Sequence, residues 1–191
     1  MAAPTINLRD LSVLIADQNT YVSKIAHNML RGFGTNNVVE VRHAMGAIQA
    51  LSGQKIDVML CDAHLPPHGG LSLIRAIRRK TDNENRTLPI LLMSADTREL
   101  AIRQARDAGA NMVIAKPMSP AGLYDRLAWL ALTPRQFVDA SAYFGPDRRF
   151  KAERHQGNRR KDDNDIVIAE ASDASPVQAD SLLGAGRTGR D

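Results

Sequence analysis

The stretch DVMLCDAHLPPHGGL, residues 57–71, contains the pattern on which the fold prediction depends. Its first part, Val58–Cys61, is a short apolar run of the kind that forms a strand buried on both faces of a parallel sheet. Asp62 follows this run directly, and an apolar stripe with helical spacing begins at Leu71. The stretch therefore predicts a strand, an acidic residue at its carboxyl end, and a helix that crosses back over the sheet.

The same alternation of apolar run and helical pattern extends over residues 10–132. Four further apolar runs predict strands: Ser12–Ala16, Val38–Val41, Leu88–Met93 and Met112–Ala115. Apolar stripes of helical period separate them, with Thr20 and Thr97 as possible N-caps of the first and fourth helices. Five strands that alternate with five helices predict an α/β domain built on a doubly wound, five-stranded parallel sheet.

A polar side chain stands at the end of four predicted strands. These residues are Asp17, Asp62, Ser94 and Lys116. The carboxyl ends of parallel strands meet at one edge of a sheet, so we expect the four side chains to converge on one crevice. Two carboxylates can hold a divalent cation, and one of them can attack a phosphoryl group. A hydroxyl and an ammonium group can contact the phosphoryl oxygens, which points to metal-assisted phosphoryl chemistry.

This set of residues resembles the receiver domain of two-component response regulators. The matching segments are LIADQ at 14–18, DVMLCDAHLPPHGGL at 57–71, PILLMSA at 89–95 and AKP at 115–117. The resemblance covers about residues 10–132 and implies the flavodoxin-like receiver fold. It implies a single-domain response regulator with a C-terminal extension, which is not an enzyme and signals by protein–protein contact.

The resemblance implies a role for each reactive residue of the crevice. Asp62 would accept a phosphoryl group from a histidine kinase or a histidine phosphotransfer protein. Ser94 would turn its hydroxyl toward the phosphoryl group on activation, and Lys116 would bridge to it. The peptide bond before Pro117 would be cis.

The same resemblance implies that Mg²⁺ binds beside the acceptor. Its ligands would be Asp17, Asp62, Gln18 and His64, the last through the backbone carbonyl only. Family members usually have two consecutive acids where this chain has Asp17 and Gln18, so we expect weaker Mg²⁺ binding. Val113 stands where many receivers have an aromatic residue that turns inward. Both departures leave open a second hypothesis, a degenerate receiver that acts as a phosphorylation-independent scaffold through its C-terminal arm.

Residues 133–150 form an aromatic extension in which Pro134 predicts one short helix. Six of the eight aromatic residues lie from Tyr124 onward, so we expect this segment to dock on the last receiver helix, on a second copy in a homodimer, or on an output partner. Residues 151–191 are polar, first basic and then mixed in charge, and are expected to be disordered. Residues 147–161 hold seven basic and two acidic residues, but no DNA-binding module follows, so a protein partner is favoured over nucleic acid.

The composition excludes several other classes of protein. The chain is 43% hydrophobic, yet its longest apolar runs are far shorter than the roughly 20 residues of a membrane span. The N-terminus lacks the features of a secretory signal. The single cysteine, Cys61, excludes an internal disulfide and reads as a small buried apolar residue. We therefore expect a cytoplasmic protein without membrane contact.

Overall fold

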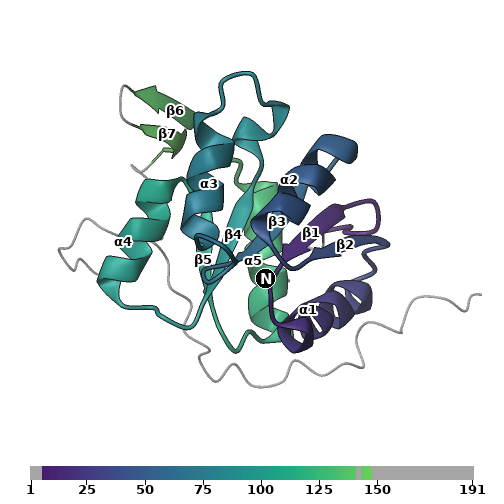
Figure 1. Cartoon of the computed structure of the whole chain (residues 1–191). Coiled ribbons are helices and arrows are strands. Elements are labelled where there is room, and N and C mark those ends of the chain that lie inside the picture. Colours follow the sequence, from purple (N-terminus) through teal and green to yellow (C-terminus); the bar gives the residue numbers. More distant parts are fainter. Residues whose placement is uncertain (1–5, 141–142, 148–191) are drawn as a thin grey trace, which may run out of the picture.

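The structure, a computed structural model, describes residues 6–140 and 143–147 and contains two sheets (Figure 1). The larger sheet has five parallel strands in the order β2-β1-β3-β4-β5. These strands are β1 (Ser12–Ala16), β2 (Asn37–Val41), β3 (Val58–Asp62), β4 (Ile90–Ser94) and β5 (Met112–Ala115). The predicted doubly wound α/β fold is confirmed, and each strand lies within two residues of its predicted bounds.

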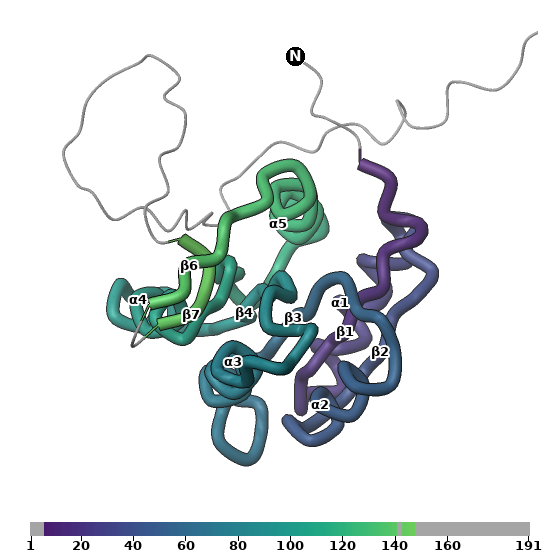
Figure 2. Tube along the Cα trace, turned by 90° about the horizontal axis from the view of Figure 1, so that it is seen from above, coloured from purple at the N-terminus to yellow at the C-terminus, as the bar shows by residue number. Residues whose placement is uncertain are grey.

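Five α-helices cover the two faces of this sheet. They are α1 (Thr20–Gly32), α2 (Ala44–Gly53), α3 (Gly70–Arg79), α4 (Glu99–Ala108) and α5 (Pro120–Leu132), with a 3₁₀ turn η1 (Glu84–Thr87) before β4. Helices α2, α3 and α4 pack on one face, and α1 and α5 on the other, so that α3 and α5 lie on opposite sides of the sheet in Figure 2. Within the described part of the chain, no helix is long and apolar enough to cross a membrane.

The side chains of β1 contribute to two hydrophobic cores, one on each face of the sheet. Leu14 and Ala16 pack with α2 and α3, whereas Val13 and Ile15 pack with α1 and α5. All four side chains are fully buried. Because successive residues of a strand point to opposite faces, a strand that is covered on both faces needs a continuous apolar run. This is why short unbroken apolar runs located the strands.

The two predicted N-caps, Thr20 and Thr97, were each wrong by one residue. Asn19, not Thr20, caps α1, and its side-chain oxygen accepts a hydrogen bond of 2.9 Å from the backbone N–H of Tyr21. Asparagine in an extended conformation is the better cap, so the helix begins one residue earlier than Thr20 would allow. Thr97 does not cap α4 either, because that helix begins at Glu99 and has no side-chain cap hydrogen bond.

The expected short helix after Pro134 is not formed. Two strands, β6 (Phe137–Ala140) and β7 (Tyr143–Pro146), pair instead as an antiparallel hairpin. Phenylalanine, valine and tyrosine favour strands, and the rings of Phe137 and Phe144 pack with their centroids 5.5 Å apart. The expected disorder of residues 151–191 concerns a segment outside the described residues.

Candidate functional site

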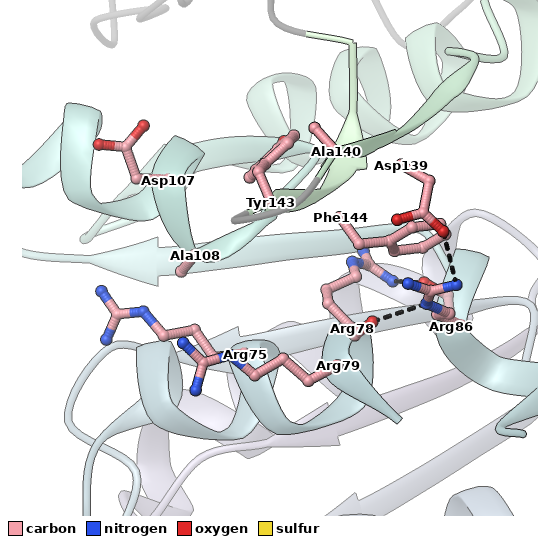
Figure 3. A pocket seen from close by; sticks show the side chains of 10 residues that line it. All are labelled: Arg75, Arg78, Arg79, Arg86, Asp107, Ala108, Asp139, Ala140, Tyr143 and Phe144. Carbon is pink, nitrogen blue, oxygen red and sulfur yellow. Dashed lines mark hydrogen bonds and ion pairs between the residues drawn. The ribbon is translucent and has the colours of Figure 1, made fainter. Parts of the chain in front are cut away.

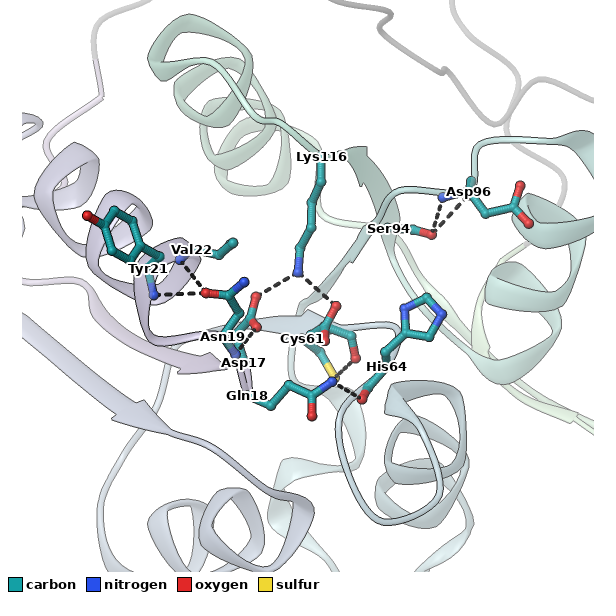
Figure 4. A network of polar contacts seen from close by, with 11 residues as sticks. Asp17, Gln18, Asn19, Tyr21, Val22, Cys61, His64, Ser94, Asp96 and Lys116 are labelled. Atoms are coloured by element: carbon teal, nitrogen blue, oxygen red, sulfur yellow. Dashed lines mark hydrogen bonds and ion pairs between the residues drawn. The ribbon is translucent and has the colours of Figure 1, made fainter.

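The four polar strand ends of the sequence prediction lie along one edge of the sheet, and Figure 4 labels three of them, Asp17, Ser94 and Lys116. Asp17 follows β1, Asp62 ends β3, Ser94 ends β4 and Lys116 follows β5. Asp17 is completely buried, while Asp62 and Ser94 are each 5% exposed. The parallel register of the strands places their last residues side by side, so chain segments up to 99 residues apart meet here.

Lys116 joins the two carboxylates. Its Nζ donates hydrogen bonds of 2.7 Å to Asp17 Oδ2 and 2.8 Å to Asp62 Oδ1. Burial alone would lower the pKa of Lys116, but the hydrogen bonds and charges of the two carboxylates outweigh it and raise that pKa. The ammonium group therefore stays charged at neutral pH. The peptide bond between Lys116 and Pro117 is cis, as the family resemblance predicts.

Gln18 lies beside this pair with its amide group turned toward the loop after β3. Gln18 Nε2 donates a hydrogen bond of 3.2 Å to the backbone carbonyl of His64. That carbonyl is the one predicted to bind a metal ion, so the Gln18 amide donates an N–H to a predicted ligand instead of turning its own oxygen toward the predicted metal site. Sequence reasoning missed this contact, because a side-chain amide presents an acceptor and a donor of similar shape.

Ser94 is hydrogen-bonded to the loop that follows it. Its hydroxyl donates to the carbonyl of Asp96 over 2.9 Å and accepts from the N–H of Asp96 over 3.0 Å. Arg98 pairs with Asp96 over 2.6 Å, and its hydrogen bonds lower the pKa of Asp96 to about 2. The sequence signal for this pair, an acid two residues before an arginine, is too common to have been singled out.

The loop and helix after Asp62 pack closely against the end of β3. A Cβ atom on Gly70 would lie 2.1 Å from the backbone oxygen of Asp62 and 2.9 Å from Cys61 Sγ. Cys61 is buried as predicted, and burial, followed by the charges of Asp62 and Asp17, raises the pKa of its thiol to about 12. Glycine at position 70 thus lets α3 start directly beside Asp62.

The donors at this edge are of the kind that Mg²⁺ prefers, but they carry little negative charge. They comprise two carboxylates and the His64 carbonyl, which offer oxygen, while the Gln18 amide donates an N–H to that carbonyl. In residues 6–140 and 143–147, no group of three or more histidine, cysteine, aspartate or glutamate side chains could hold a metal ion. The residues fit a cation that keeps several water ligands.

A profile of the response regulator receiver domain matches residues 13–128, which contain the whole of this site. The chain belongs to the response regulator receiver family. This receiver is 31% identical over 119 residues to chemotaxis protein CheY-3 of Vibrio cholerae, a match that covers 62% of this chain and 90% of that protein. Receiver domains are signalling modules rather than classical enzymes, and they pair with histidine kinases.

A longer relative and two solved structures extend the comparison. The sensory/regulatory protein RpfC of Xanthomonas campestris is 31% identical over 131 residues, which cover 69% of this chain but only 18% of RpfC. A putative response regulator from Chloroflexus aurantiacus has a TM-score of 0.57 at 31% identity, over 61% of this chain and 93% of that one. The receiver domain of the sensor histidine kinase PA1611 from Pseudomonas aeruginosa has a TM-score of 0.55 at 28% identity, over 62% of this chain and 94% of that one. In that homologue a magnesium ion is coordinated in the active-site cleft.

Proposed function

We propose that Asp62 accepts a phosphoryl group from the phosphohistidine of a histidine kinase or a histidine phosphotransfer protein. The observation that carries this proposal is the Lys116 ammonium group, which lies within hydrogen-bond distance of both Asp17 and Asp62. Two nearly buried carboxylates that share one cation keep an excess negative charge at the strand ends. Such a site suits a divalent cation together with a nucleophilic carboxylate.

The transfer itself needs little from the protein beyond positioning and charge. A carboxylate oxygen of Asp62 forms the new P–O bond while the P–N bond of the donor breaks and its electrons return to the imidazole. Lys116 then contacts a phosphoryl oxygen, and Ser94 reaches the phosphoryl group by giving up its hydrogen bonds to Asp96. Mg²⁺ held by Asp17, Asp62 and the His64 carbonyl would offset the negative charge of the phosphoryl oxygens.

Phosphorylation of the full chain tests the proposal. The protein is incubated with Mg²⁺ and a small acyl phosphate, and its intact mass is measured. We expect one added phosphoryl group in the unchanged protein and none in Asp62→Asn. Asp82→Asn is the matched control, because Asp82 is exposed and lies before η1 and β4, whereas the site lies at the carboxyl ends of the strands. Undiminished labelling of Asp62→Asn, or no labelling of the unchanged protein, would contradict the assignment.

The output of the switch is proposed to be protein contact through α4, β5 and α5. Leu100 on α4 supports this assignment, because its side chain is 68% exposed in an otherwise polar helix surface. The contact partner would be an output protein or a second copy of the chain. Light scattering with and without phosphorylation separates the two, since a homodimer doubles the molar mass.

One observation favours the alternative, a phosphorylation-independent adaptor. The Gln18 amide donates to the carbonyl that a metal ion would need, and no acid stands next to Asp17. An adaptor of this kind would keep its partner in an Asp62→Ala variant, whereas a phosphorylation switch would lose the phosphorylation-dependent part of binding. Pull-down of the same partner with both proteins distinguishes the two functions.

A further inference from the structure

A polar cavity of about 390 Å³ lies between α3, the end of α4 and the β6–β7 hairpin (Figure 3). Its lining includes the last two turns of α3 and Arg86, which precedes β4. It therefore lies toward the amino end of β4, whereas Asp62 lies at the carboxyl ends of the strands. Four arginines and two aspartates line this cavity, so that positive charge is in excess.

The hairpin closes one side of the cavity and is packed firmly on the receiver. The guanidinium group of Arg86 lies 3.4 Å from the ring centroid of Phe144 and forms an ion pair of 3.2 Å with Asp139. A Cβ atom on Gly145 would lie 3.1 Å from the Cα of Gly109, so the two backbones touch. The hairpin of the C-terminal extension thus forms one wall of the cavity, and the receiver without this hairpin would not enclose it.

Two of the four arginines have structural roles. Arg78 is 2% exposed and donates to the carbonyls of Gly109, Arg86 and Leu88 and to the side chain of Asn111. Arg86 donates to the carbonyl of Arg78 in addition to pairing with the hairpin. Neither guanidinium group is available to a ligand without loss of these contacts.

The other two arginines, Arg75 and Arg79, lie one turn apart on α3 and are exposed. Within residues 6–140 and 143–147, neither guanidinium group takes part in a hydrogen bond or an ion pair. The remaining carboxylate of the lining, on Asp107, lies 3.7 Å from Arg106. The guanidinium groups of Arg75 and Arg79 therefore face the cavity with N–H donors that no described residue accepts from.

We infer that this cavity binds a small anion that carries phosphate groups, with Arg75 and Arg79 as its ligands. A guanidinium group presents paired N–H donors that match two oxygens of a phosphate, and two of them suit a diphosphate. Arg75 and Arg79 lie on the α3 side of the cavity, and Tyr143 lies on the hairpin side (Figure 3). The ring of Tyr143 is placed to contact an uncharged part of the ligand.

The size of the cavity favours a small molecule over a protein segment. A volume of about 390 Å³ lies within the range of small-ligand pockets, roughly 300–1,000 Å³. The ligand would touch α4 and the hairpin together, so it would link the C-terminal extension to the receiver. This inference does not depend on phosphorylation of Asp62.

Calorimetric titration of the full chain with inorganic phosphate, pyrophosphate and ADP, without Mg²⁺, tests the inference. We expect saturable binding that Arg75→Gln/Arg79→Gln weakens at least tenfold and Asp62→Asn leaves unchanged. Lys24→Gln/Lys55→Gln is the matched control, because it removes the same charge from exposed positions outside the cavity, and it should change the affinity less than twofold. Tighter binding of ADP than of pyrophosphate would identify a nucleotide as the ligand. Equal affinities for ADP and pyrophosphate would show that only the phosphate groups are recognised, which favours a free phosphate compound.

Three results would overturn the inference. One is the absence of saturable binding by any of the three probes. Another is an equal loss in both double variants, which would show diffuse electrostatic attraction. The third is that a hexaglutamate peptide binds, whereas none of the three phosphate probes does, and that its binding is lost in Arg75→Gln/Arg79→Gln. This result would make the cavity a site for an acidic protein segment. Backbone amide shifts at Ala108 and Phe144 on addition of inorganic phosphate give a second readout, because both residues line the cavity.

Discussion

At the scale of single residues, we expect Gln18 to set how strongly the proposed phosphorylation site holds a cation. It stands beside Asp17 without contributing a charge, and its amide hydrogen-bonds the His64 carbonyl. Gln18→Glu adds a third carboxylate and removes that donor, so we expect the dissociation constant for Mg²⁺ to fall about tenfold, since ligand charge sets the affinity of oxygen-donor sites. Calorimetry measures the change, and Gln49→Glu on the exposed side of α2 is the control. An equal gain in the control would show that only net charge matters.

Cys61 gives a prediction about reactivity. Burial and the nearby charges of Asp62 and Asp17 raise the pKa of its thiol from 9.0 to about 12. A raised pKa keeps the thiol protonated, and only the thiolate reacts, so the reactive fraction at pH 8 is about a thousandfold smaller than in the unfolded chain. Cys61 is the only cysteine, so alkylation of the intact protein reports on it alone. Equal alkylation rates in buffer and in urea would show that the site is open to solvent.

At the scale of secondary structure, the start of α3 depends on a residue without a side chain. A Cβ atom on Gly70 would overlap the backbone oxygen of Asp62, which cannot move aside as a flexible side chain could. We expect Gly70→Ala to lower the free energy of unfolding by roughly 2 kcal/mol or more. Gly53→Ala at the end of α2, where nothing lies within 4 Å, is the control and should be neutral or slightly stabilising. Urea unfolding curves of both variants measure these changes in the free energy of unfolding.

The features that could be predicted from the sequence depend on local patterns, whereas those that could not depend on contacts between residues far apart in the chain. Strands such as β3 were predictable because burial on both faces demands an unbroken apolar run, and the strand ends followed because parallel strands end at one edge. Contacts such as that of Gln18 with His64 join chain segments whose pairing no local pattern encodes. The hairpin was mistaken for a helix because Pro134 suits a first helical turn, whereas packing of Phe137 and Phe144 on the receiver favours strands.

At the scale of the whole molecule, Arg78 connects parts of the chain that are distant in sequence. It lies under the hairpin, 5.0 Å from the ring centroid of Phe137, and satisfies four acceptors around η1 and β5. Burial lowers the pKa of Arg78 to about 10, so it remains charged at neutral pH. Arg78→Met would remove the side-chain donor from the carbonyls of Gly109, Arg86 and Leu88, whereas Asn111 Oδ1 keeps the N–H of Ile90. We expect a loss of roughly 3 kcal/mol in unfolding free energy. Arg79→Met, one residue along on the exposed face, should cost less than about 0.5 kcal/mol.

The same packing predicts that hairpin and receiver unfold together. Phe144 stacks on Arg86, and the backbone of the hairpin touches Gly109 at the end of α4. Phe144→Ala removes a half-buried ring and its contact with a cation, so we expect the unfolding free energy of the whole domain to fall by roughly 1–2 kcal/mol. Val138→Ala, whose side chain is 38% exposed, should change it by less than about 0.5 kcal/mol. Trp129 fluorescence and far-ultraviolet circular dichroism should follow one urea transition, because a hairpin that folded independently would leave the Trp129 transition unmoved in Phe144→Ala.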